Sequence, residues 1–243
     1  NEGWLSFFTT NYQNQHKMLL HNMRDGMFED VTLATGADAG CYAYVNWGCG
    51  MVDFDNDGHK DIFIGNGHTE DNIERIDRTT AYRCHNALLW NTGKGRFINV
   101  SEECGLNALP RHAARGVAFE DLDNDGDLDA VIVNSRERAT VLRNMLRENG
   151  SKNHWLQVRL EGVKTNRDGV GAHVKVLTGA MVQLDEVHSG RGYQSHWGTR
   201  LHFGLGPHAR VDRLEVRWPG GGKDILENLP ADRLVTVSQT HNR

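Results

Sequence analysis

The sequence predicts an all-β fold in which partial repeats are followed by a second, compact β domain. Three observations predict it: a recurring strand–acidic loop–strand motif, short alternating strands in the second half, and 27 glycines against 4 prolines to supply turns. The 243 residues suffice for one large domain or two ordinary ones. Apolar residues make up 38% and charged residues 24% of the chain, which is typical of a globular protein with a core.

The repeat is visible in two pairs of segments. The stretch MVDFDNDGHKDIFIGN (51–66) occurs again within VAFEDLDNDGDLDAVIVN (117–134). Segments 18–32 and 87–101 share Leu-Leu-x-Asn, a glycine turn and Phe-x-x-Val-Ser/Thr, and residues 140–144 begin that half once more. The unit is therefore a four-stranded antiparallel sheet of about 50–70 residues, which needs neighbours to bury both faces, as β-propeller blades do.

Residues 1–8 align with residues 56–63, so the sequence starts inside a third acidic loop. Glu2 and Ser6 fall at ligand positions of this copy, and we expect it to be degenerate and without metal. A propeller closes with about 4–8 blades, more than this sequence supplies. We therefore expect either a fragment of a longer protein or blades completed by another copy, which would give an oligomer or fibre by strand exchange.

The acidic loops have the ligand pattern of a calcium site. Asp-x-Asp-x-Asp-Gly places hard oxygen ligands at alternate positions, and oxygen-only sets favour Ca²⁺ over zinc or copper. An EF-hand requires Glu at position twelve and flanking helices, whereas Ile64 and Ile132 stand there between strands. The alternative is a solvated turn held by Asx hydrogen bonds. The two predicted sites comprise the side chains of Asp53, Asp55, Asp57 and Asp61 with the carbonyl of His59, and those of Asp121, Asp123, Asp125 and Asp129 with the carbonyl of Asp127.

The second half changes pattern after residue 150. Alternating apolar residues in HWLQVRL, HVKVL, MVQLDEV, RLEVRW and RLVTVS are separated by glycine-containing turns. Such short strands predict a compact antiparallel β-sandwich or barrel. We therefore divide the chain into blades over 1–150 and a β domain over 151–243.

The acidic hairpins resemble the FG-GAP/VCBS repeat of integrin-α-like β-propellers. The segments NHWLQVRLEGVKTNRDGVGAHV, GRGYQSHWGTRLHFGLG and VDRLEVRWPGG make residues 153–238 resemble an ASPIC/UnbV domain. This combination is similar to the cartilage-acidic-protein-like family. The resemblance implies structural Ca²⁺ at the aspartates above and a secreted protein, although a typical member carries a whole propeller and most of one is absent here.

The cysteines all lie in the first half and include no CxxC pair. In an oxidising compartment they would form two disulfides, and we favour local pairing because shorter spans are easier to close. The alternative is buried free thiols. The favoured pairs are Cys41 with Cys49 and Cys84 with Cys104. Sequons at Asn99 and Asn149 are compatible with a secreted glycoprotein.

Other chemistry receives little support. The net charge of -5 without a basic cluster argues against nucleic-acid binding, and no apolar run is long enough to span a membrane. The 13 histidines include no HExxH motif, and neither a P-loop nor a GxSxG elbow occurs. Segment 190–198, GRGYQSHWG, has residues that bind sugars or anions, but we expect a turn packed on its own sandwich. We likewise expect His68 to be a loop histidine.

These observations favour a non-enzymatic, calcium-stabilised, extracellular structural or adhesion protein. We expect a protein or glycan partner at the cell surface or matrix, with self-assembly as a further expectation. One alternative is a carbohydrate-binding module that uses aromatic loops. Another is an accessory protein of a biosynthetic pathway, for which the sequence offers no catalytic constellation.

Overall fold

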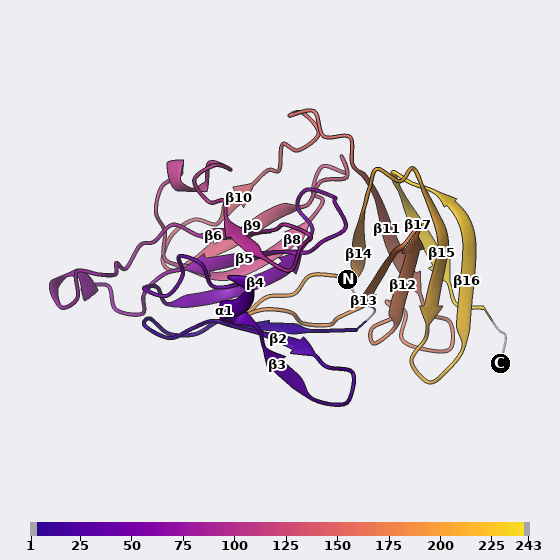
Figure 1. Ribbon diagram of the computed structural model, residues 1–243, viewed down its shortest axis with the longest axis horizontal. Helices are drawn as coiled ribbons and strands as arrows, with labels where there is room; N and C mark the ends of the chain where they lie inside the picture. Colours follow the sequence, from indigo (N-terminus) through magenta and orange to yellow (C-terminus); the bar gives the residue numbers. More distant parts are fainter. Residues whose placement is uncertain (1–3, 241–243) are drawn as a thin grey trace.

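The computed structural model describes residues 4–240 and is nearly all β. Figure 1 shows two neighbouring bodies, one containing β1–β10 and the other β11–β17. The described strands form five separate sheets, and none of these sheets closes into a barrel. The all-β prediction is therefore confirmed. No helix in the described part of the chain combines the length and apolarity that a membrane crossing requires.

The first body contains one four-stranded and two three-stranded sheets, each antiparallel and in chain order. The four-stranded sheet has the predicted repeat unit: β4 (Asn46–Val52), β5 (Asp61–Asn66), β6 (Ala87–Asn91) and β7 (Phe97–Asn99). One three-stranded sheet consists of β1 (Phe7–Thr9), β2 (Met18–Asn22) and β3 (Phe28–Asp30). The other consists of β8 (Ala114–Glu120), β9 (Asp129–Asn134) and β10 (Thr140–Leu142). Short helices α1 (Thr32–Thr35), η1 (Ile73–Arg75) and η2 (Leu106–Ala108) lie in the connections.

Register places both acidic loops at hairpin ends. Val52 pairs with Asp61 at the end of β4 and β5, and Glu120 pairs with Asp129 at the end of β8 and β9. Every residue of β5 is buried, because this strand lies between β4 and β6 and is covered on both faces. Each hairpin therefore connects its acidic loop directly to a largely buried strand, β5 or β9.

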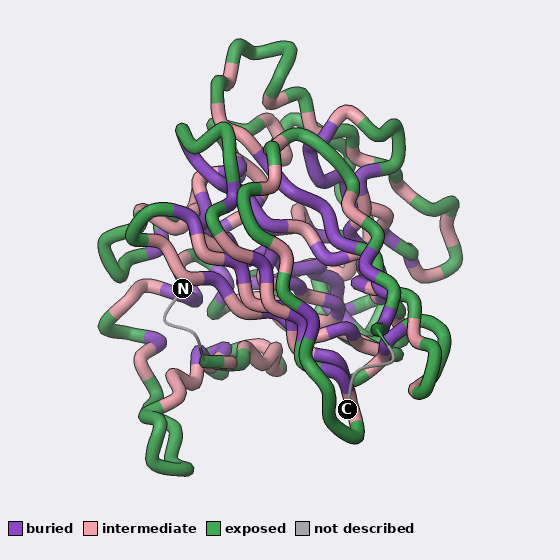
Figure 2. The backbone as a smooth tube through the Cα atoms, turned by 90° about the vertical axis from the view of Figure 1, so that its right-hand side faces the viewer, coloured by how far each residue is buried: buried purple, intermediate pink, exposed green. Residues whose placement is uncertain are grey.

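The second body is a sandwich of two sheets. One has the order β14-β11-β17 and the other β13-β12-β15-β16. Side chains from both sheets, including Val158, Phe203, Val176 and Leu214, form one buried cluster. Figure 2 shows this buried interior with exposed loops around it. The strands are β11 (His154–Glu161), β12 (His173–Thr178), β13 (Met181–Glu186), β14 (Arg200–Gly206), β15 (Arg210–Arg217), β16 (Lys223–Pro230) and β17 (Arg233–Ser238).

One strand pair departs from the predicted antiparallel pattern. β17 runs parallel to β11, with Val158 opposite Val235, while the other pairs in this body are antiparallel. A short corner, in which Asp232 has a positive φ of 59°, separates β16 from β17. The chain changes sheets at this corner, so β17 does not return beside β16.

Candidate metal centres

The first acidic loop folds its backbone N–H groups onto its own carboxylates. Asp53 Oδ1 accepts a hydrogen bond from Asp57 N–H (3.2 Å), and Asp53 Oδ2 accepts one from Gly58 N–H (2.8 Å). Gly58 has φ +91°, a conformation that glycine adopts without a Cβ penalty. As a result, one oxygen each of Asp53, Asp55 and Asp61 lie within 4.8 Å of one another. This convergence suits a single cation.

The second loop repeats this geometry. Asp121 Oδ1 accepts from Asp125 N–H (3.1 Å), and Asp121 Oδ2 accepts from Gly126 N–H (3.0 Å). One oxygen each of Asp121, Asp123 and Asp125 lie within 4.8 Å of one another. A further group of the same compactness combines Asp125 with Asp127 and Glu148. Glu148 was not among the residues singled out in the sequence, because it lies outside the loop.

The ninth-position aspartates tie each loop to a neighbouring strand. Asp61 accepts backbone hydrogen bonds from Phe54 (3.0 Å) and Asn91 (2.8 Å). Asp129 accepts equivalent bonds from Leu122 (3.1 Å) and Asn144 (2.8 Å). These carboxylates therefore close the loop whether or not they also contact a metal.

The predicted ligands are not all brought together. Asp57 lies outside the three-residue group of the first loop, and Asp129 lies outside that of the second. The carboxylate of Asp127 is buried and accepts from Asn56 Nδ2 (3.1 Å) and Arg147 N–H (2.9 Å). For His59 and Asp127 the expected ligand is the carbonyl, and their role, like that of the other eight aspartates, stays a prediction.

Burial makes the first loop unfavourable for uncompensated charge. Burial, with repulsion from Asp55, raises the pKa of Asp53 well above its ordinary value. Burial also raises the pKa of Asp61 to about 8 and that of Asp57 to about 6, against opposing backbone hydrogen bonds. A bound cation would offset this cost by stabilising the ionised forms. The donor set consists of oxygens alone and so fits Ca²⁺.

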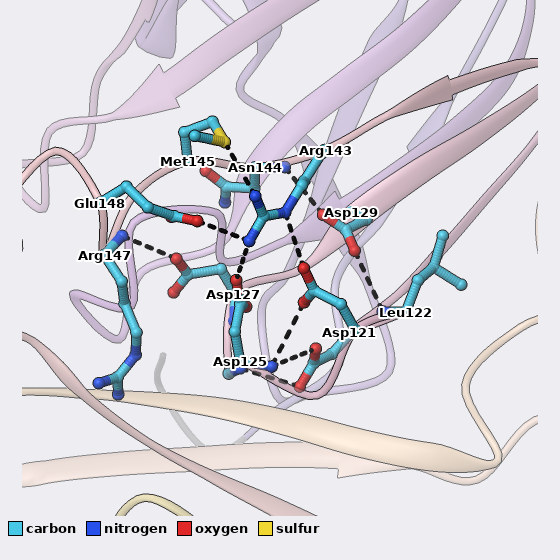
Figure 3. A network of polar contacts seen from close by, with 12 residues as sticks. Asp121, Leu122, Asp125, Asp127, Asp129, Arg143, Asn144, Met145, Arg147 and Glu148 are labelled. Carbon is cyan, nitrogen blue, oxygen red and sulfur yellow. Dashed lines mark hydrogen bonds and ion pairs between the residues drawn. The ribbon is translucent and has the colours of Figure 1, made fainter.

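In the second loop, a neighbouring arginine compensates part of the negative charge. A hydrogen bond from Arg143 lowers the pKa of Asp123, while burial raises that of Asp125 and brings that of Asp127 to about 6. Figure 3 shows the Arg143 guanidinium among the carboxylates of this loop and Glu148.

Both acidic loops pack against the sheet β14-β11-β17. Asn56 lies between ligand positions of the first loop. Its backbone carbonyl accepts a hydrogen bond from Gly206 N–H (2.8 Å), and its side-chain Oδ1 lies 2.6 Å from His202 Nε2. Gln157 Nε2 of β11 donates to Asp121 Oδ2 (2.7 Å). The loops are thus part of the junction between the two bodies, a role that the sequence did not indicate. One signal was readable: Gln157 is a polar residue within an apolar strand.

Glycines allow this close approach. A Cβ at Gly204 of β14 would lie 2.0 Å from Asp53 Oδ2, and one at Gly126 would lie 1.9 Å from Trp155 Nε1. Neither position has room for a side chain, so the two bodies meet backbone against loop.

The segment between β13 and β14 crosses to the first body, as the orange trace in Figure 1 shows. Trp197 packs edge-on against Phe119 (5.0 Å), and Ser195 Oγ accepts from Val117 N–H of β8 (3.0 Å). The expectation that residues 190–198 pack on their own sandwich is therefore wrong. The physical reason is that β8 offers an unpaired N–H and an aromatic face, which this segment covers.

A buried ion network fastens the same junction. Asp185 of β13 binds Lys60 Nζ (2.5 Å) from the first acidic hairpin and Arg191 Nη2 (2.9 Å). Burial opposes ionisation of Asp185, but these two cations outweigh it and lower its pKa.

His68 is a loop histidine, as expected from the sequence. Its side chain is buried, its Nδ1 accepts from Glu70 N–H (3.0 Å), and its Nε2 lies 3.4 Å from Tyr12 Oη.

The predicted disulfides are not formed, since all four cysteines are free. The sulfurs instead donate to nearby carbonyls, as Cys84 does to Ala81 (3.0 Å) and Cys104 to Ser101 (3.7 Å). Cys41 lies within a buried apolar cluster, where burial raises its pKa to about 12. Cys49 lies on β4, where burial raises its pKa to about 11. The structure therefore agrees with the alternative expectation, that the cysteines are free thiols.

The two sequons differ in accessibility. Asn99 Nδ2 donates to the carbonyl of Ala39 (2.8 Å), whereas Asn149 is exposed. Only Asn149 is therefore placed where modification would leave the packing intact.

A polar cavity of about 270 Å³ lies at the opposite end of the blades. Strands β5 and β9 start at the acidic loops and end at Asn66 and Asn134, close to the cavity residues. Its lining consists of Thr69, Glu70, Asp71, Asn72, Tyr82, Ser135 and Arg136.

Comparison with known proteins agrees with this architecture. Residues 53–132 match the model of the FG-GAP-like repeat, and residues 162–243 match that of the ASPIC and UnbV domain. The chain is 26% identical to cartilage acidic protein 1 of Xenopus tropicalis over 256 residues, which cover 86% of this chain and 39% of that protein. It is 27% identical to the Homo sapiens protein of the same name over 193 residues, or 76% of this chain and 26% of that protein.

The chain thus spans well under half the length of these relatives. Both domain resemblances expected from the sequence are confirmed, in the expected order. The chain thus combines a segment that matches the FG-GAP-like repeat with a C-terminal segment that matches the ASPIC and UnbV domain, and it is similar to cartilage acidic protein 1.

Proposed function

We propose that this chain is part of an extracellular, adhesion-like structural protein in which calcium holds the blades against the ASPIC/UnbV domain. The observation that carries the proposal is the position of the acidic loops, which contact the second body through Asn56 and Asp121. A cation that orders these carboxylates would therefore order the junction as well.

The electrostatics of the first loop support this role. Three carboxylates converge within 4.8 Å, and Asp53 and Asp61 are almost completely buried. When bound, calcium would supply the positive charge that such a group requires. Asn56 and His202 would then transmit the fixed loop geometry to β14.

An extracellular location is supported by the relatives. Their name refers to cartilage, a tissue rich in extracellular matrix. Calcium sites of low affinity, with dissociation constants near about 10⁻³ M, are filled only where calcium is abundant, as it is outside cells. The same proposal assigns the chain no catalytic role.

Thermal unfolding and limited proteolysis test the calcium proposal. With calcium in excess over EGTA, we expect a higher melting temperature and slower cleavage between the two bodies, near residues 145–152. A matched titration with magnesium controls for ionic strength. Identical melting and cleavage with and without calcium, once metal removal is confirmed by elemental analysis, would contradict the proposal.

The polar cavity supports a partner site at the end of the blades opposite the acidic loops. Its hydroxyl, carboxylate and guanidinium groups, from Tyr82, Ser135, Glu70 and Arg136, suit a hydroxyl-rich ligand such as a glycan. The aromatic segment 190–198 is a poorer candidate, because Trp197 is buried against the blades. A glycan array with wild type and Arg136→Ala tests this: binding lost in the variant supports the cavity, and no binding by wild type counts against it.

Self-assembly has one supporting observation. Phe7 and Phe28 form an edge-to-face pair (4.9 Å) on the small sheet β1-β2-β3, and both remain more than two fifths exposed. Such a pair favours contact with another protein surface. Light scattering after size-exclusion chromatography should show a concentration-dependent mass that Phe28→Ser reduces. A monomeric mass at every concentration would contradict self-assembly.

A further inference from the structure

We propose that the two acidic loops differ in their need for calcium, because the second carries an internal counter-ion, Arg143, that the first lacks. The inference rests on the proposed calcium role and identifies Arg143 as the residue that sets the affinity of the second loop.

Arg143 bridges two predicted ligands. Its Nε donates to Asp123 Oδ2 (2.7 Å), and its Nη2 lies 3.3 Å from Asp125 Oδ2. The same nitrogen lies 2.5 Å from Glu148 Oε1, so a carboxylate outside the loop holds the guanidinium in place. Figure 3 shows the Arg143 guanidinium between Asp125 and Glu148. Positive charge is therefore already present where positions three and five of the loop offer oxygens.

The repeat identifies the residue that takes this place in the first loop. Leu142-Arg143-Asn144 aligns with Leu89-Trp90-Asn91. Both asparagines donate their backbone N–H to the ninth-position aspartate at 2.8 Å, which shows that the two segments are structurally equivalent. Trp90 Nε1 donates to Asp55 Oδ2 (2.8 Å), as Arg143 donates to Asp123. The hydrogen bond is thus kept, but its donor is neutral in the first loop and charged in the second.

Within residues 4–240, no lysine takes the place of this charge in the first loop. Lys60 lies next to Asp61 in the sequence, but its ammonium group binds Asp185 of the second body. His59 contributes its backbone N–H to Asp57 Oδ1 (2.7 Å). A bound cation would therefore supply the positive charge that Arg143 already provides in the second loop.

The second loop has more carboxylates, but they do not cancel the effect of Arg143. Glu148 is paired with Arg143 itself, and Asp127 is occupied by Asn56 Nδ2 and Arg147 N–H. Calcium entering this loop must share Asp123 and Asp125 with the guanidinium or displace it. Since Arg143 is half exposed, displacement is feasible and its cost is moderate. Exposed ion pairs are weak individually, and we expect about tenfold weaker calcium binding than in the first loop, which corresponds to about 1.4 kcal/mol.

Calorimetric titration with calcium on the 243-residue chain tests the inference. Asp53→Asn and Asp121→Asn are matched changes of buried residues at the same loop position, and each removes one carboxylate from the converging group of its loop. We expect the Asp121→Asn protein, which retains the first loop, to bind calcium about tenfold more tightly than the Asp53→Asn protein. Exchanging the donors should reverse the order: Arg143→Trp strengthens the second loop and Trp90→Arg weakens the first.

Arg210→Trp is the control, since Arg210 Nη2 donates to the carbonyl of Asn228 (2.8 Å) between β15 and β16, away from both acidic loops, and should not affect affinity. Circular dichroism checks folding, and Arg143→Gln replaces Arg143→Trp if the tryptophan variant does not fold. Equal affinities of the two loops, or exchanges without effect, would overturn the inference while leaving the proposed calcium role intact. Absence of binding at both loops would overturn the proposed role itself and the inference with it.

Discussion

Replacing Asp185 by asparagine tests the buried ion network that joins the two bodies. The carboxylate accepts from Lys60 Nζ at 2.5 Å and from Arg191 Nη2 at 2.9 Å. Its side chain is 6% exposed, and those of Lys60 and Arg191 are 21% and 19% exposed. Asparagine keeps the shape and one acceptor oxygen, but it leaves two mostly buried cations without their counter-ion.

The expected loss follows from this burial. Removing one partner of a buried ion pair costs about 3–5 kcal/mol. Because both cations retain some contact with solvent, we expect the lower end, about 3 kcal/mol. For a chain of this size, 1 kcal/mol corresponds to about 2–4 °C in melting temperature, so the variant should melt roughly 6–12 °C below wild type.

Differential scanning calorimetry at pH 7 in calcium measures this loss, with the exposed residue Asp168 changed to asparagine as the control. Measuring the same stability difference at acidic pH provides a second test. The folded-state pKa of Asp185 is lowered, so its contribution is present above the unfolded pKa of about 3.9 and is lost as pH falls below that value. The stability difference between wild type and variant should therefore narrow below pH 4. A folded Asp185→Asn protein within 1 °C of the control would refute the reasoning.

Three further predictions concern the junction and the thiols. Gly204→Ala should lower the melting temperature and weaken calcium binding at the first loop, since its Cβ has no room, whereas Gly190→Ala, with open space around it, should change neither. Burial lowers the pKa of His202 to about 3, so below about pH 6.5 the unfolded state gains a proton that the folded state lacks. The free energy of unfolding should therefore fall by up to about 1.4 kcal/mol per pH unit as the pH decreases. In denaturant titrations, His202→Asn should flatten this slope. Finally, a thiol reagent should modify exposed Cys104 in the native protein long before buried Cys41, and equal rates would contradict the described packing.

Much of the local structure was predictable because it depends on neighbouring residues. Period-two alternation and the glycine turns predicted the strands of both bodies, and β4–β7 form the four-stranded unit that the repeat implied. The Asp-x-Asp-x-Asp-Gly spacing predicted that carboxylates converge, because Gly58 permits a turn that aims its N–H groups at Asp53. The parallel pairing of β17 was missed, since alternation specifies the faces of a strand but not its neighbour.

The sequence by itself determined the two kinds of domain, their order and the acidic hairpins, because each depends on the spacing of residues that are close together in the chain. Only the tertiary structure decided what these hairpins contact. It brought Asp185 to Lys60 and Gln157 to Asp121, and it placed Trp197 in the core of the blades. It also placed Arg143 in the second loop where Trp90 stands in the first. Such partners lie tens of residues apart or more, and their pairing depends on how whole sheets pack, which no local pattern specifies.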